Sequence, residues 1–387
     1  ALSQVKGHPL QTFTRENEAL TKLIDRMKEL LHDTDERTCS GSRQADEKQA
    51  DTGSLPQIAA LLLKIREVAV HYAKKGDLLY PHLNARYGIA GPSAVMWTAD
   101  DEIRDELGAL CKALQKERET AEQRATESKG REATEQNAVD GRGKETAEQN
   151  ATGSFQSSQW DAKWLERLQK VLLRAEEMIY KENHILFPNC AVNFTEEDWM
   201  GIYRDAKDYA DCLGVHGEVW EEAENWLRKE KEAKKTVFKG TKDSQASEGE
   251  EDRAGSNFSD GVIHMPGGHM TIRQLTALLN TIPLEISFID AEDRNCYFNE
   301  GPKVFKRAQM ALGRSVFTCH PPKVETMVRR IIGEFRERTL DRVPVWMDKG
   351  GRTMLVTYMA VRDESGEYMG TMELVQDMEF AKEHFGK

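Results

Sequence analysis

Seven histidine, aspartate and glutamate side chains lie where a helical bundle could use them to bind a metal. Metal sites in bundles are built from imidazole and carboxylate groups that project inward from facing helices. His71 follows Val68 by one turn at the end of an apolar stripe, and Glu182 continues the line of Ala175 and Ile179. A carboxylate on that face must be paired, neutralised or bound to a metal, because burying it alone is costly. The candidate ligands are His8, His71, Asp100, Asp101, Glu177, Glu182 and His184. The alternative to metal binding is that these histidines are hydrogen-bonded within the core, or that the side chains lie at a solvated end of the bundle.

Cys319 and His320 form a second candidate site in a different part of the chain. Either side chain could supply an axial ligand to haem. The alternative is that Pro321 and Pro322 simply begin a helix, with His320 near its cap.

No other motif in the sequence predicts chemistry. A nucleophile with its base, a phosphate-binding loop and a kinase signature are all missing. The glycine pair in 266–268 lacks the spacing and the lysine of a phosphate loop, so it is predicted to be a turn. We therefore expect a binding protein and not an enzyme, with a signal that leaves through an unknown protein partner.

The composition is typical of a soluble cytoplasmic protein with two or three domains. The 387 residues carry a net charge of -12, which argues against binding to nucleic acid or to an anionic membrane. The apolar stretch 58–65 is too short to span a bilayer, and the N-terminus does not read as a signal peptide. Six scattered cysteines without a CxxC pair indicate reduced thiols. Because the chain starts with Ala1, we expect that a longer natural N-terminus has been removed.

Three polar segments divide the chain into two compact regions. Residues of about 35–54 and 119–158 are predicted to be unstructured insertions, the second with a short polar repeat, and residues 234–268 a linker. Residues 1–233 are predicted to form the first region and residues 269–387 the second.

The first region shows helical periodicity throughout. Helices are predicted after Pro9, after Ser54, over about 94–114 and over about 160–187, with a shorter continuation over 196–233. Four main helices with apolar stripes favour an antiparallel bundle. Both insertions would then lie at the same end of the bundle.

The second region changes to the period of strands. Two strands are predicted near 284–290 and 294–299, then helical residues to about 338, and then three strands near 342–347, 353–361 and 367–374. This order predicts an α+β domain with an antiparallel sheet.

Four blocks of the first region, in order, resemble the hemerythrin-like (HHE cation-binding) family. They are Gly7–Leu10 with Glu16 and Asn17, His71–Pro81, Val95–Trp97 with Asp101–Arg104, and Met178–Pro188. Residues 286–290, 296–299 and 370–377 resemble a PAS domain. Members of this family often join the two domains, in proteins of the DUF438 type. The expected fold is thus an all-α four-helix hemerythrin-like bundle followed by an α+β PAS domain. Such proteins usually carry a further small helical domain before the first block.

The resemblance implies a non-haem di-iron centre, or a relic of one, inside the bundle. His8 would be its lone histidine ligand and His71 the ligand of the second helix. Glu177 and Glu182 would occupy the positions of the two ligands that the family carries on its last helix. The sequence departs from the family at Lys75, where a glutamate ligand is expected, and at Asp100, where relatives usually have histidine. A mixed histidine and carboxylate site could still hold iron, manganese or zinc.

Three hypotheses of function follow. The leading one is a cytosolic sensor whose bundle binds a metal, and through it a diatomic or small-molecule ligand, coupled to a ligand-binding PAS domain that could pair as a homodimer. The alternative is a scaffold without metal, in which the PAS domain alone senses a ligand such as haem. The third, a di-iron enzyme, needs more ligands than the sequence offers.

Overall fold

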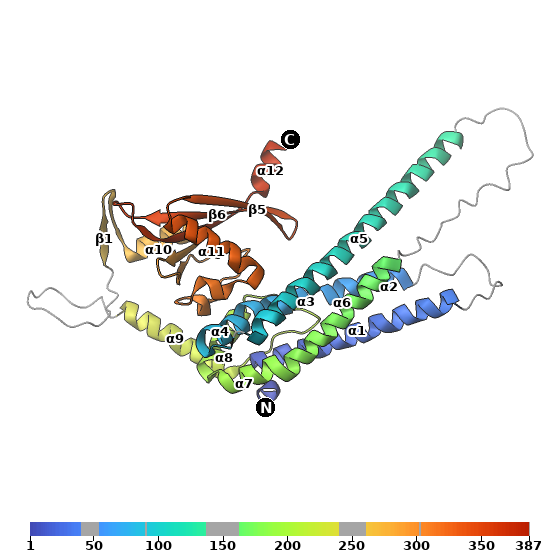
Figure 1. Ribbon diagram of the computed structural model, residues 1–387, viewed down its shortest axis with the longest axis horizontal. Coiled ribbons are helices and arrows are strands. Elements are labelled where there is room, and N and C mark those ends of the chain that lie inside the picture. The colour runs from blue at the N-terminus through green and yellow to red at the C-terminus, as the bar shows by residue number, and fades with distance from the viewer. Residues whose placement is uncertain (40–53, 90, 137–161, 240–260, 302, 387) are drawn as a thin grey trace, which may run out of the picture.

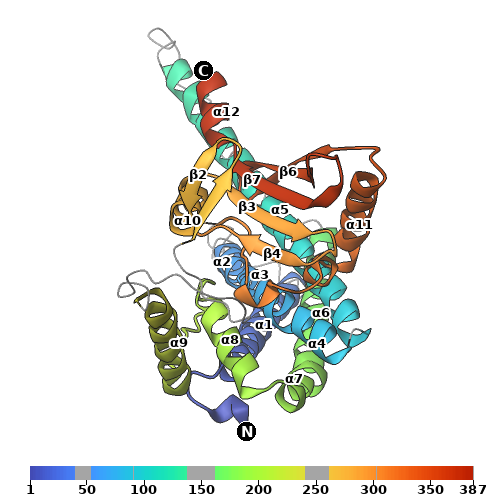
Figure 2. The same cartoon turned by 90° about the vertical axis from the view of Figure 1, so that its left-hand side faces the viewer.

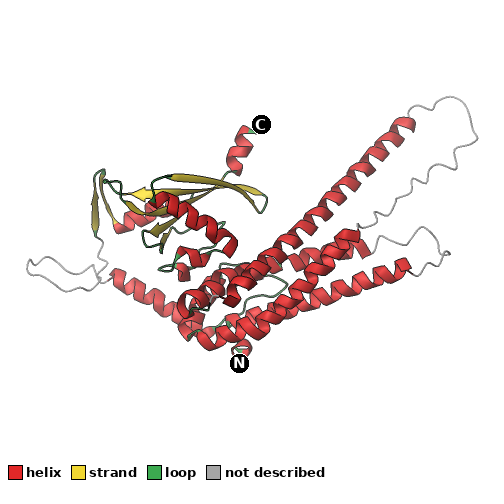
Figure 3. Cartoon of the chain, in the orientation of Figure 1, coloured by secondary structure: helices red, strands yellow, loops and turns green. Residues whose placement is uncertain are grey.

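The computed structural model of the chain describes residues 1–39, 54–89, 91–136, 162–239, 261–301 and 303–386. A bundle of long helices and a smaller domain built on a β-sheet are joined near one end of the bundle (Figure 1). The predicted fold class, a helical bundle followed by an α+β domain, is confirmed (Figure 3).

Helices α1 to α7 form the bundle, and α8 and α9 follow at the end nearest the sheet domain (Figure 1). The helical elements of this region are α1 (Pro9–Cys39), α2 (Ser54–Arg66), α3 (Val68–Lys74), η2 (Lys75–Leu79), α4 (Tyr80–Tyr87), α5 (Gly91–Gln136), α6 (Ala162–Lys181), η3 (Glu182–Leu186), α7 (Phe187–Asn193), α8 (Glu196–Ala206) and α9 (Glu221–Lys239).

Local capping fixes where α1 and α8 begin. The backbone N–H of Leu10 donates to His8 Nδ1 over 3.0 Å, which satisfies one of the free donors of the first turn of α1. Thr195 and Asp198 form a capping box at the start of α8. His8 is therefore a helix cap in this fold.

Two π-helical turns interrupt the bundle helices, and each one precedes a proline. The turn η2 lies before Pro81 and the turn η3 before Pro188. Proline has no N–H to donate and its ring collides with the carbonyl of the preceding turn in a regular α-helix. A wider turn accommodates that misfit, and it re-aims the side chains within it.

Three helices run further than their predicted ends. Helix α5 continues through 119–136, the first half of the predicted insertion, α1 reaches Cys39, and α9 reaches Lys239 in the predicted linker. These extensions are rich in Ala, Glu, Gln, Lys and Arg and contain no proline, so their intrinsic helix propensity is high. The rest of the two insertions and most of the linker lie outside the described residues.

The second domain is a five-stranded antiparallel sheet with the strand order β4-β3-β7-β6-β5. Helix α11 (Pro322–Arg336) packs on β6 and β7. The strands of the sheet are β3 (Glu285–Asp290), β4 (Asn295–Phe298), β5 (Arg342–Lys349), β6 (Arg352–Arg362) and β7 (Tyr368–Asp377). The chain ends in a short helix, α12 (Glu379–Phe385).

A small hairpin precedes this sheet and spans the predicted boundary between the linker and the second region at residue 268. Strands β1 (Val262–Met265) and β2 (Gly268–Thr271) pair around residues 266 and 267, so the turn predicted there is confirmed. Helix α10 (Ile272–Thr281) follows, with Thr271 as the N-cap of a capping box.

The sheet domain rests on the bundle near α4, α5 and α8 (Figures 1 and 2). Ala308 and Met310, which precede α11, pack against the hydrophobic core of the bundle. Figure 1 shows that α1 and α5 both run away from the sheet domain and diverge toward their C-terminal ends. Within the described residues, no helix is long and apolar enough to cross a membrane.

A buried charge cluster at the candidate metal centre

Six charged side chains from four parts of the bundle meet in its interior. Each is at most 6% exposed. They come from α1, from α3 with the turn η2, from α5 and from the turn η3. The members of this buried charge cluster are Glu16, His71, Lys74, Lys75, Asp100 and Glu182.

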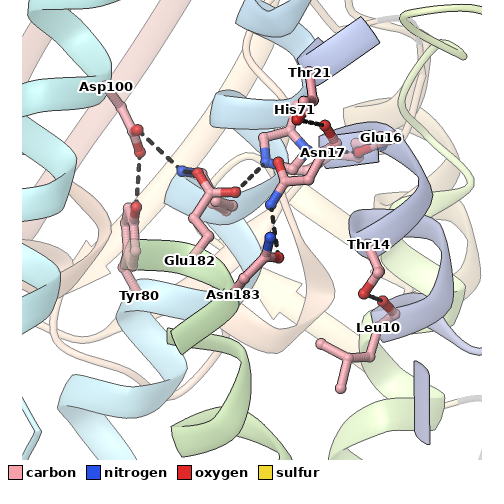
Figure 4. Close-up of polar contacts among 12 residues, drawn as sticks. Leu10, Thr14, Glu16, Asn17, Thr21, His71, Tyr80, Asp100, Glu182 and Asn183 are labelled. Carbon is pink, nitrogen blue, oxygen red and sulfur yellow. Dashed lines mark hydrogen bonds and ion pairs between the residues drawn. The ribbon is translucent and has the colours of Figure 1, made fainter. Parts of the chain in front are cut away.

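His71 lies at the centre of the cluster between two carboxylates (Figure 4). Its Nδ1 is 2.7 Å from Glu16 Oε2 and its Nε2 is 2.9 Å from Glu182 Oε2. Burial alone would lower the pKa of His71, but the attraction of Glu182 and the hydrogen bonds to both carboxylates raise it. A protonated imidazole can donate to both carboxylates at once.

Two lysines complete the pairing of the carboxylates. Lys74 donates to Glu16 Oε1, and Lys75 donates to Glu182 Oε1 and, over 3.0 Å, to Asp100 Oδ1. Lys75 Nζ also lies 4.4 Å from the centre of the Tyr72 ring. Burial would raise the pKa of Glu182, but Lys75 and His71 outweigh it and lower that pKa to about 2.

Tyr80 supplies the last contact to the cluster. Its hydroxyl donates to Asp100 Oδ2 over 2.7 Å. Burial raises the pKa of Asp100 to about 6, although Lys75 acts against that rise. With the three carboxyl groups ionised and His71 protonated, the positive and negative charges of the cluster balance.

The arrangement does not fit a di-iron centre. Every carboxylate oxygen of Glu16, Asp100 and Glu182 already has a hydrogen-bond donor, and both nitrogens of His71 face carboxylates. The two ammonium groups would repel a cation placed among these oxygens. Within the described residues, no group of three or more His, Cys, Asp or Glu side chains is arranged to hold a metal ion.

The structure brings together only three of the seven predicted ligands, namely His71, Asp100 and Glu182. His8 lies elsewhere, with its ring centre 4.7 Å from those of both Trp199 and Trp220. Burial lowers the pKa of His8 to about 4, as expected of a neutral histidine between two indole rings.

The remaining predicted ligands point away from the bundle core. Asp101 pairs with Arg104 over 2.7 Å, and the side chain of Glu177 is 59% exposed. His184 is exposed, stacks on Tyr180 and has its Nδ1 2.9 Å from the carbonyl oxygen of that residue. His184 stands two residues after Glu182, and residues two apart on a helix do not share a face, so the burial of Glu182 leaves His184 outside.

Four residues of the site were not predicted to belong to it. Glu16 stands one turn after Phe13 on the buried face of α1, and that spacing could have identified it. Tyr80 precedes the proline of α4. Lys74 and Lys75 carried no usable signal, because lysine on a helix is almost always solvated.

Cys319 and His320 lie at the edge of the PAS-like cup, between the sheet and α11. His320 Nδ1 is 2.7 Å from the carbonyl oxygen of Val316, and Asn295 Nδ2 lies 3.5 Å from Cys319 Sγ. The cavity beside His320 has a volume of about 10 Å³ and is lined mainly by apolar side chains such as Ile289 and Ile332. That space holds about one water molecule. Haem does not fit it.

Polar contacts tie the second domain to the bundle. The backbone N–H of Met310 donates to Asp205 Oδ2 over 3.1 Å, and Arg314 donates to Nδ1 of His82. Nε2 of the same ring is 2.9 Å from Asp198 Oδ1, although the geometry is not that of a hydrogen bond. Burial, followed by the charge of Arg314, lowers the pKa of His82 to about 4.

Family models match both halves of the chain. Residues 8–190 match the hemerythrin HHE cation binding domain, and residues 275–379 match a PAS domain. Both are typically binding or sensory domains, so the matches indicate no enzyme family. No curated protein matches this chain.

Solved structures similar to the chain cover its C-terminal part. The C-terminal domain of a Streptococcus mutans protein is 35% identical over 32% of this chain and 98% of its own, with a TM-score of 0.31. A sensory box sensor histidine kinase of Vibrio cholerae is 12% identical over 27% of this chain and 89% of its own, with a TM-score of 0.22. The VqmA chain of a VqmA–ligand–DNA complex of Vibrio cholerae is 21% identical over 30% of this chain and 60% of its own, with a TM-score of 0.23.

Proposed function

Because residues 8–190 form a hemerythrin HHE domain and residues 275–379 form a PAS domain, we propose that this protein is a sensor in which two buried lysines replace the metal of the bundle. The bundle then acts as a ligand-responsive scaffold, and the PAS domain carries the response to a partner. The proposal shares the metal-free scaffold of the alternative drawn from the sequence but differs from it in making the bundle, and not the PAS domain alone, responsive to a ligand. The hydrogen bonds of Lys74 and Lys75 within the cluster support it over a metal-binding bundle.

The position of Lys75 carries this proposal. Lys75 stands four residues after His71, where the family resemblance places a glutamate ligand, and its ammonium group lies between Glu182 and Asp100. An ammonium group among carboxylates provides the positive charge that a metal would otherwise provide. It binds them through hydrogen bonds, so the site needs no cation from solution.

The contacts between the domains support the second half of the proposal. Asp205 and His82 belong to the bundle region, and they hold Met310 and Arg314 of the PAS domain. A change in the packing of α8 would therefore reach the segment before α11 directly. Pairing of two chains through the PAS domain stays a prediction, supported by apolar side chains of α10 such as Leu278, which is 47% exposed.

Metal analysis tests the proposal. Protein purified without air, then incubated with Fe²⁺, Mn²⁺ or Zn²⁺ and desalted, should retain no stoichiometric metal, and Mn²⁺ should not raise its melting temperature. Lys75→Glu exchanges the ammonium group for a carboxylate at the position of the expected ligand, so this variant should gain stabilisation by Mn²⁺. Lys170→Glu, on the exposed face of α6, is the matched control and should behave as the unmodified protein. One or two metal ions retained per unmodified chain would overturn the proposal.

A further inference from the structure

A cavity of about 330 Å³ opens between the start of α1, the end of α8 and the loop 207–219. This α1–α8 cavity is distinct from the PAS cup and has the size of a small-molecule site. Its walls include the rings of Phe13 and Tyr203 and the aliphatic side chains of Pro9 and Val219. At its inner wall it reaches Lys74 and Glu16, the outermost pair of the buried charge cluster.

Lys74 gives the cavity a specific polar group. Its side chain is 7% exposed, and among the described residues its one hydrogen-bond acceptor is Glu16. An ammonium group has three N–H donors, and buried donors are normally satisfied. The ring of Phe13, 5.5 Å from Lys74 Nζ, faces the ammonium group but offers no oxygen. Lys74 therefore favours a ligand that brings an acceptor oxygen into the cavity.

The other charges of the lining argue against a charged ligand. Glu224 accepts from Lys207 and from the hydroxyl of Tyr203, Glu218 pairs with Arg15, and Asp211 lies 2.8 Å from His216. Each of these carboxylates already has a partner, and Lys74 itself is paired with Glu16, so an anion would find no unpaired positive charge in this lining. A cation would be repelled by Lys74 at the inner wall.

We propose that the α1–α8 cavity binds a small uncharged organic molecule with a carbonyl oxygen, an amide or a ketone, whose oxygen accepts a hydrogen bond from Lys74. The apolar part of the ligand packs against the rings of Phe13 and Tyr203. No covalent step is involved.

The cavity is also placed to affect the contact between the domains. Ala206 and Lys207 line it, and they directly follow Asp205, which accepts the hydrogen bond from Met310. Tyr209, another lining residue, donates to Asp77 Oδ2 over 2.5 Å. The site thus supplies an input for the proposed sensor, but its existence does not depend on the absence of a metal.

Three probes of the same shape and different charge test this inference. Benzamide, benzoate and benzylammonium are titrated into the full chain at millimolar concentrations and followed by calorimetry and ligand-observed NMR. We expect benzamide to bind more tightly than the other two. Lys74→Met should weaken benzamide binding by about tenfold or more, because a hydrogen bond to a charged donor is lost, while Lys74→Arg should retain part of it.

A second variant covers the case in which Lys74→Met fails to fold. Ala206→Leu fills the cavity without changing any charge and should abolish benzamide binding. Ala113→Leu, at a half-buried alanine of α5 outside the cavity, should leave binding unchanged. No binding of benzamide, equal binding to the Ala206→Leu protein, or a preference for benzoate or benzylammonium would each overturn the inference. Metal retention by the unmodified protein would overturn the proposed function but would leave these results untouched.

Discussion

Lys75 Nζ lies 3.0 Å from Asp100 Oδ1 in the interior of the bundle, where neither side chain is more than 2% exposed. Removing two charges from water is costly, and their mutual attraction repays that cost only when the remaining donors and acceptors are satisfied. Glu182 and Tyr80 provide those further partners. The stability of the bundle is therefore sensitive to the loss of either Lys75 or Asp100.

Removal of the Lys75 ammonium group should strongly destabilise the bundle. Lys75→Met keeps the length of the side chain but leaves Glu182 and Asp100 without their shared donor, at an expected cost of about 3–5 kcal/mol in the free energy of unfolding. Urea denaturation followed by circular dichroism measures the change. Lys170→Met, at an exposed position of α6, should change stability by less than about 0.5 kcal/mol.

The same pair can be tested for coupling. Adding Asp100→Asn to Lys75→Met should cost less than the sum of the two single substitutions, because the second change removes a charge that the first left unpaired. Strict additivity would show that Lys75 and Asp100 do not interact as the structure describes.

The sequence predicted the helices and strands largely because their apolar spacing is regular. Ile58, Leu62 and Ile65 follow one face of α2, and all three are buried. The same reasoning placed His71 and Glu182 on core faces, where they are found. These predictions rest on local periodicity, which is a property of the sequence alone.

The chemistry of the site could not be predicted in this way. Whether Lys74 and Lys75 are solvated or buried depends on which carboxylates of distant helices face them, and Glu182 lies 107 residues from Lys75. Glu182 is also buried and His184 exposed, although both lie in one short motif. A side chain's partner in space, and not its type, decides its role here.

His8 should make the stability of the protein depend on pH. Its pKa is about 4 in the folded chain and 6.5 ordinarily, so below pH 6.5 the unfolded chain takes up a proton that the folded chain does not. The burial of a neutral His8 therefore contributes fully to the free energy of unfolding above pH 6.5, and this contribution is lost as the pH falls from 6.5 to 4.

His8→Asn isolates that effect. Asparagine can accept the hydrogen bond from the N–H of Leu10 and so keeps the cap of α1, but it does not titrate. The melting temperature of this variant should fall less between pH 7 and pH 4.5 than that of the unmodified protein. Parallel curves for the two proteins would contradict a neutral, buried His8.

Haem should not bind at His320. The adjoining cavity of about 10 Å³ is closed by the side chains of Val328 and Ile332, so a porphyrin could enter only if the domain core opened. Titration of haem into the protein should give no Soret band that depends on His320→Ala or Cys319→Ser. A stoichiometric band that either substitution removes would show that the cup expands around a large ligand.

The hydrogen bond between Met310 and Asp205 should control how firmly the PAS domain rests on the bundle. Asp205→Ala removes the charged acceptor of the Met310 N–H, so hydrogen exchange at this amide should accelerate by about tenfold or more. Mass spectrometry of the peptide that contains Met310 measures the rate. Asp208→Ala, at an exposed position three residues later, is the matched control and should leave the rate unchanged. Equal exchange in both variants would mean that the amide is protected by the packing of Met310 against α8 and not by this hydrogen bond.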